Sequence, residues 1–221
     1  MATSPVPRGV LWDLDGTLID SAEAHYLAWH ETLAERGHDH SREEFFRGFG
    51  KRNDLVLRAI FGDALAPEEA ERLADVKEER YRRHVRTHGV ELCAGATDWL
   101  TRLREDGFRQ ALATSAPPEN VTVVVEILGL ERYIDATASA RDVERGKPDP
   151  AIFLEAARRI GVSPERCVVM EDAPPGLEGA RRAGMRSVGL LSPHHRELEA
   201  DVVVGSLTEL APDVFDALLG P

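Results

Sequence analysis

Two aspartates, Asp13 and Asp15, close an apolar segment near the start of this 221-residue chain. The segment Val10–Leu14 has the apolar continuity of a buried strand, and Gly16 allows a sharp turn directly after it. Both carboxylates are therefore expected at the carboxyl edge of a sheet, where open α/β folds bind their ligands. Such a pair suits phosphoryl-transfer chemistry, although a solvated Asp-x-Asp-Gly turn is a common alternative for these residues alone.

A second apolar run, Val168–Met170, also ends in acids, Glu171 and Asp172. A carboxylate reacts with a phosphate dianion only when the charge between them is neutralised, so this chemistry needs a cation. Mg²⁺ prefers oxygen ligands, and four are expected here. They are the carboxylates of Asp13, Glu171 and Asp172 and the backbone carbonyl of Asp15. An exposed Glu-Asp turn is the alternative, but two acid clusters at strand ends of one sheet rarely arise by chance.

A lysine and a hydroxyl complete the set of candidate catalytic residues. Lys147 can hold a carboxylate nucleophile ionised and stabilise the charge of the transition state, or it can be a surface lysine before a helix. Thr114 ends a predicted strand, and Pro117 and Pro118 open the next helix. The Thr114 hydroxyl and the amides from Ser115 onward can hold phosphate oxygens, which is compatible with a plain helix cap.

Helices and strands alternate from Gly95 onward, and these elements must position the acids. Helices are predicted at 99–105, 119–128, 151–160 and 177–183, and strands at 110–114, near Ile134, at 167–171 and at 187–190. Such alternation predicts an α/β fold with a doubly wound parallel sheet.

The segment between the first strand and Glu91 is charged and helically periodic. Helix starts are indicated by Asp20 with Glu23, Ser41 with Glu44, and Pro67, and helix stops by Gly37, Gly50, Gly62 and Gly89. We therefore expect an all-helical cap at residues 20–91, inserted into a catalytic core made of residues 1–19 and 92–221.

The formal net charge of −12 disfavours nucleic acid and anionic membranes as partners. The basic stretch Arg80–Arg86 lies in a helical pattern and is interpreted as a solvated helix face. The expected partner is a small-molecule phosphate ester, and nothing in the sequence requires more than a monomer.

Two cysteines, Cys93 and Cys167, are too few for a disulfide framework in a chain of this length. The segment Met1–Pro7 lacks the apolar core of a signal peptide, and the sequence contains no transmembrane run. These features predict a cytoplasmic protein.

Four motifs, taken in order, resemble those of the haloacid dehalogenase superfamily, and the resemblance covers essentially the whole chain. The motifs are Asp13–Thr17, Thr114–Ser115, Gly146–Pro150 and Glu171–Gly176. The resemblance implies that Asp13 is a nucleophile that becomes an aspartyl phosphate and that Asp15 is the general acid/base. It also implies catalytic roles for Thr114 and Lys147.

The helical insert between the first two motifs is similar to the small cap of β-phosphoglucomutases and related sugar-phosphate phosphatases. His25 and Trp29, one helical turn apart, match the histidine and tryptophan after the first motif of that family. Arg52 and Lys77 resemble cap residues that meet the sugar phosphate, and Ser115 is expected to bind substrate with them. The alternatives are a packing role for Trp29 and solvated positions for His25 and Lys77.

Two departures from the mutase pattern favour hydrolysis. Thr17 stands where these mutases typically have valine, and Ala116–Pro118 replaces a polar group that grips the distal phosphate of a bisphosphate. Proline offers neither a side-chain donor nor an amide. The predicted function is a Mg²⁺-dependent phosphatase for a sugar phosphate, with a β-phosphoglucomutase as the alternative.

Two other classes of protein compete with this prediction. A dehalogenase has no leaving oxygen to protonate, which would leave Asp15 and the Glu171–Asp172 pair without purpose. A non-catalytic regulatory module would be expected to have lost Asp13 or Asp15, and both are present.

Overall fold

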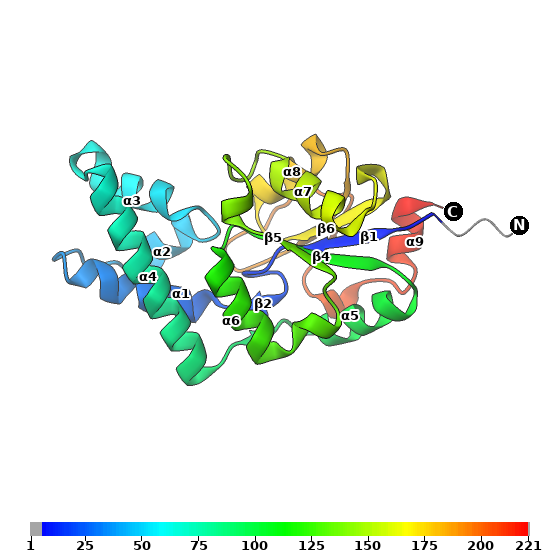
Figure 1. Ribbon diagram of the computed structural model, residues 1–221, viewed down its shortest axis with the longest axis horizontal. Helices are drawn as coiled ribbons and strands as arrows, with labels where there is room; N and C mark the ends of the chain where they lie inside the picture. The colour runs from blue at the N-terminus through cyan, green and yellow to red at the C-terminus, as the bar shows by residue number, and fades with distance from the viewer. Residues whose placement is uncertain (1–5, 221) are drawn as a thin grey trace, which may run out of the picture.

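The computed structural model describes residues 6–220 as a parallel sheet with helices on both faces, beside a separate group of helices (Figure 1). The sheet has six strands in the order β5-β4-β1-β6-β7-β8, and each neighbouring pair is parallel. In that order the strands are Ala136–Ala138, Arg109–Ala113, Gly9–Trp12, Cys167–Glu171, Arg186–Leu190 and Val202–Val204. The predicted doubly wound α/β fold is confirmed, with β1 between β4 and β6, where the strand order reverses and ligands bind.

Alternate residues of β1 pack into two different hydrophobic clusters, as the period of a strand requires. Val10 and Trp12 pack with α5, α6 and α9, whereas Leu11 packs with α7 and α8 on the opposite face. These helices are Ala96–Glu105, Pro118–Leu128, Val214–Leu219, Ala151–Ile160 and Pro174–Arg182, in that order. Burial on both faces explains why β1 is a continuous apolar run.

The separate group of helices lies at the left of Figure 1. They are α1 (Ala22–Ala34), α2 (Arg42–Gly48), α3 (Asn53–Phe61) and α4 (Pro67–His88). The chain enters the group through β2 (Ile19–Asp20) and leaves it through β3 (Glu91–Leu92), and these two strands pair antiparallel. Short 3₁₀ turns occur at Gly62–Ala64, Leu130–Arg132, Ala140–Asp142, Pro164–Arg166 and Leu207–Glu209.

Two of the three predicted helix starts are confirmed. Ser41 caps α2 in a reciprocal capping box with Glu44, and Pro67 is the first residue of α4. The start at Asp20 is wrong, because the backbone there is extended and pairs with Glu91. Helix α1 therefore begins two residues later, at Ala22.

The predicted strands are confirmed except near Ile134. Ile134 lies before β5, and its amide donates to the Leu130 carbonyl at the end of a 3₁₀ turn. The edge strand β8 was not predicted, since three valines give too short a pattern. Strand β1 ends at Trp12, which leaves Asp13 as the first residue beyond it.

The basic stretch Arg80–Arg86 lies in α4 but is not simply solvated. Arg80 donates to the Thr32 hydroxyl over 3.1 Å and pairs with Glu35, so it ties α4 to α1. Both cysteines are free, and burial raises the pKa of Cys93 to about 11 and that of Cys167 to about 12.

Within residues 6–220, none of the helices combines the length and the apolar character that crossing a membrane requires. The sequence predicts that Met1–Pro7 is not a signal peptide. Most of this segment lies outside the described residues.

Candidate active site

Lys147 joins the ends of the two central strands. Its ammonium donates to Asp13 Oδ1 over 2.5 Å and to Glu171 Oε2 over 2.7 Å. The Asp13 amide, in turn, donates to the Met170 carbonyl over 2.9 Å, which continues the pairing of β1 with β6. The two predicted acid clusters therefore lie at one edge of the sheet.

The carboxylates of Asp13, Glu171 and Asp172 are buried, with ligand oxygens within 4.8 Å of one another. Burial, together with repulsion from Asp13, raises the pKa of Glu171 to about 8 and that of Asp172 to about 7, despite the charge of Lys147. Excess negative charge in a buried oxygen cluster is what a divalent cation neutralises. These residues fit Mg²⁺, and the Asp15 carbonyl remains a predicted ligand.

Two glycines make room for these acids. Gly16 has a φ of +89°, and a Cβ there would lie 2.6 Å from Asp172 Oδ2. A Cβ at Gly176, in the first turn of α8, would lie 2.1 Å from the Glu171 carboxyl carbon. Thr17 donates its hydroxyl to Asp172 Oδ1 over 3.3 Å, a bond that valine could not make.

Asp15 faces the helical group instead of the acidic cluster. The Ser21 hydroxyl donates to Asp15 Oδ1 over 2.6 Å, and His25 Nε2 lies 3.1 Å from the same oxygen. Lys77 Nζ lies 2.9 Å from His25 Nδ1. An ammonium can only donate, so Nδ1 accepts from Lys77 and Nε2 carries the proton that faces Asp15.

These contacts keep the Asp15 carboxyl ionised. Burial alone would raise its pKa, but the interaction with His25 and the hydrogen bond from Ser21 hold the pKa below its usual value.

Sequence reasoning missed Glu78, which holds Lys77 in place. Lys77 is only 3% exposed, and its ammonium donates to Glu78 Oε1 over 2.8 Å. Asn53 of α3 and Asn120 of α6 donate to the two Glu78 oxygens over 2.7 and 2.6 Å. Burial alone would raise the pKa of Glu78, but Lys77 leads the interactions that lower it to about 2. The signal that could have located Glu78 is its spacing along α4. Glu78 lies three residues before the buried Tyr81, and residues three apart share one face of a helix.

A cavity of about 470 Å³ separates the helical group from the sheet edge. Of the predicted residues, it is lined by Asp15, His25, Trp29, Arg52, Lys77 and Ser115. An adjoining recess is lined by Arg52, Ser115, Thr114 and Lys147. Trp29 also packs within the helical group, with its ring 5.3 Å from the Lys77 ammonium. The structure therefore brings all of the candidate site residues to one region.

Two central strands of a doubly wound sheet end in carboxylates, and Lys147, which contacts Asp13 and Glu171, lines the recess beside the cavity. Such an arrangement is typical of α/β enzymes. The model of the haloacid dehalogenase-like hydrolase family matches residues 7–184, and the chain belongs to this family.

Named relatives cover nearly the whole chain. The validoxylamine A 7'-phosphate phosphatase of Streptomyces hygroscopicus subsp. limoneus is 31% identical over 90% of this chain and 94% of its own. The β-phosphoglucomutase of Bacillus subtilis is 31% identical over 94% and 93%. The crystal structure of CbbY from Rhodobacter sphaeroides in complex with phosphate has a TM-score of 0.85 at 28% identity, and covers 93% of this chain and 97% of that one.

Proposed function

We propose that this protein is a phosphatase that hydrolyses a small sugar phosphate through a phosphoaspartate on Asp13. The observation that supports this function most is the Lys147 bridge between Asp13 and Glu171, with Asp172 beside them. A lysine between carboxylates holds the nucleophile ionised at a place where a phosphoryl group brings further negative charge.

In the proposed reaction, one Asp13 oxygen attacks phosphorus while the bond from phosphorus to the ester oxygen breaks. Asp15 gives its proton to the departing alkoxide. Asp15 then takes a proton from the water that attacks the phosphoaspartate, which frees phosphate and restores Asp13. Mg²⁺, held by Asp13, Glu171 and Asp172, would supply the charge that lets an anionic carboxylate approach an anionic phosphoryl group.

Asp15 has to take up a proton from solvent when the substrate binds, because the carboxyl is ionised in the free protein. A phosphate dianion in the cavity adds a like charge, which raises the pKa of Asp15 and favours its protonated form. His25 and Lys77 orient the carboxyl, while Thr114 and Ser115 hold phosphoryl oxygens.

We interpret residues 20–91 as a cap that closes the cavity and selects the sugar. Arg52 spans the two parts, since it lies in front of α3 and donates to the Glu144 carbonyl over 3.3 Å. The named phosphatase and mutase relatives support a phosphorylated, sugar-like substrate.

This function is tested by measuring the release of inorganic phosphate with and without Mg²⁺. The substrates are a panel of sugar phosphates, phosphoglycolate and nucleotides. We expect Mg²⁺-dependent turnover that is fastest with a sugar phosphate. Failure to release phosphate from any of these esters would overturn the proposal.

A β-phosphoglucomutase is the second candidate, because Lys51, Arg52 and Arg141 line the same cavity and offer charges for a second phosphate. Ala116 and Pro117 also line it and contribute no polar side chain, which weakens that grip. Formation of glucose 6-phosphate from β-glucose 1-phosphate, faster than release of phosphate, would favour the mutase.

A further inference from the structure

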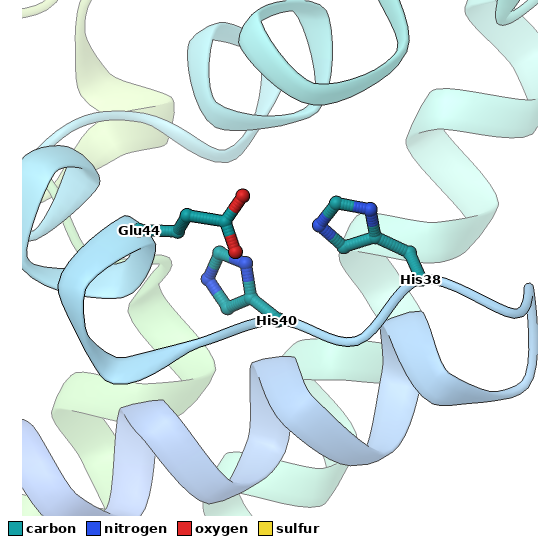
Figure 2. A group of neighbouring side chains, drawn as sticks. All are labelled: His38, His40 and Glu44. Carbon is teal, nitrogen blue, oxygen red and sulfur yellow. The ribbon is translucent and has the colours of Figure 1, made fainter.

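A second cluster of metal-ligand side chains lies in the helical group. His38 and His40 belong to the loop between α1 and α2, and Glu44 lies in the first turn of α2. Their ligand atoms lie within 4.8 Å of one another. Figure 2 shows the two rings and the carboxylate around one shared space.

Three of the four ring nitrogens of this cluster are buried without a hydrogen-bond partner among the described residues. Within residues 6–220, both nitrogens of His40 and Nε2 of His38 are buried without a hydrogen bond, and His40 is only 1% exposed. A neutral imidazole presents one donor and one acceptor, so leaving it buried and unpaired is unfavourable. A cation beside these rings would accept their lone pairs.

The Glu44 carboxylate has an oxygen left for such a cation. The amide and the hydroxyl of Ser41 both donate to Glu44 Oε2 over 3.0 Å, in the box that caps α2. Oε1 accepts none of these bonds. The cap also fixes the carboxylate at the start of the helix, and Figure 2 shows it beside the His40 ring.

Two imidazoles and one carboxylate select the kind of ion. Mg²⁺ and Ca²⁺ prefer oxygen ligands, whereas Zn²⁺ and similar transition metals take histidine nitrogen readily. Zinc–nitrogen bonds of about 2.0–2.1 Å place tetrahedral ligand atoms roughly 3.4 Å apart. The ligand atoms, which lie within 4.8 Å of one another, must therefore approach by at most about 1.4 Å, and rotation of the half-buried His38 side chain toward the capped Glu44 carboxylate allows this.

Aromatic side chains surround the cluster. The rings of Trp29 and Phe45 lie 6.4 and 6.5 Å from the His40 ring, and the Phe61 ring lies 6.0 Å from that of His38. Such a shell limits competing water, which strengthens metal coordination.

We propose that His38, His40 and Glu44 bind a divalent transition-metal ion such as Zn²⁺, with water in the fourth position. The ion ties the loop between α1 and α2 to the first turn of α2. Because His40 also lines the cavity, the ion fixes part of the cavity wall as well.

The site is tested by calorimetric titration of the metal-free full chain with Zn²⁺. Excess Mg²⁺ is present to occupy the acidic cluster of Asp13, Glu171 and Asp172. We expect one Zn²⁺ to bind per chain. The variants His38→Gln and Glu44→Gln should each bind it at least about tenfold more weakly. Glutamine also accepts the Ser41 bonds, so Glu44→Gln retains the cap of α2.

His88→Gln is the matched control. His88 is exposed on α4, with its ring 5.8 Å from that of His84, and this pair could capture Zn²⁺ adventitiously. The control should bind Zn²⁺ as the wild type does. Equal affinity in all variants, a loss confined to His88→Gln, or no binding to the wild type would overturn the proposal.

Cobalt(II) bound to the wild type gives a readout that depends on no variant. We expect the intense visible bands of a four-coordinate ion, saturating at one equivalent. Only the weak bands of six-coordinate Co²⁺ would contradict the site.

Discussion

Asp13 and Asp15 are one residue apart, yet they have different electrostatic surroundings. Asp13 shares Lys147 with Glu171, and burial raises its pKa although Lys147 opposes the shift. Asp15 contacts Ser21 and His25, which lower its pKa. Separate surroundings let two carboxylates take the different roles of nucleophile and proton donor.

Asp13→Asn should abolish turnover, because an amide is a far poorer nucleophile than a carboxylate. We expect kcat for phosphate release to fall at least about a thousandfold with little change in Tm. Asp98→Asn, at an exposed position in α5, is the matched control and should retain full activity. Near wild-type turnover by Asp13→Asn would refute the nucleophile assignment.

The acidic cluster makes the metal-free protein sensitive to pH. Glu171 and Asp172 have folded pKa values of about 8 and about 7, above the reference values of 4.5 and 3.8. The folded chain therefore binds protons that the unfolded chain has released, so their contribution to stability falls as pH rises through that window.

Mg²⁺ needs the deprotonated acids, so its stabilising effect should grow with pH. Urea unfolding with Mg²⁺ or with a chelator, at pH 6 and pH 8, measures this effect. We expect Mg²⁺ to raise the urea midpoint more at pH 8. An equal increase at both values would show that the cluster does not bind the ion.

At the scale of elements, Glu78 connects three helices. It lies in α4, accepts from Asn53 of α3 and Asn120 of α6, and pairs with the buried Lys77. This network joins the helical group to a core helix and holds the lysine that contacts His25.

Glu78→Gln should lower the free energy of unfolding by about 3 kcal/mol, because it leaves the Lys77 charge buried without its carboxylate. Glu79→Gln, one residue along α4 and exposed, should change it little. Chemical denaturation of both variants checks this, and equal stability would show that the network contributes nothing.

At the scale of the whole molecule, we predict a monomer. The large hydrophobic side chains that are exposed among the described residues lie on several different elements and loops. They are Val6, Leu55, Val76, Ile127, Leu154, Leu191 and Val203. Single exposed side chains do not form the apolar patch that a stable dimer buries. Light scattering at micromolar concentration should give the mass of one chain, and a dimer mass would contradict the prediction.

The sequence alone determined the fold class and the acids at the ends of its strands. Strands β1 and β6 lie at the centre of the sheet and are buried on both faces, so each has a continuous apolar run. The first acid after each apolar run, Asp13 or Glu171, therefore marks the edge of the sheet. Local signals also located the starts of α2 and α4, because a capping box and a first-turn proline act within one helical turn.

Only the tertiary structure decided which charged residues are buried. Lys77 and Glu78 stand in a run of charges that resembles a solvated helix face, and their partners lie on three other helices. Asp20 resembled a helix cap until its pairing with Glu91 made it a strand residue. Spacing along the chain reports contacts within an element, whereas contacts between distant segments depend on how the elements pack.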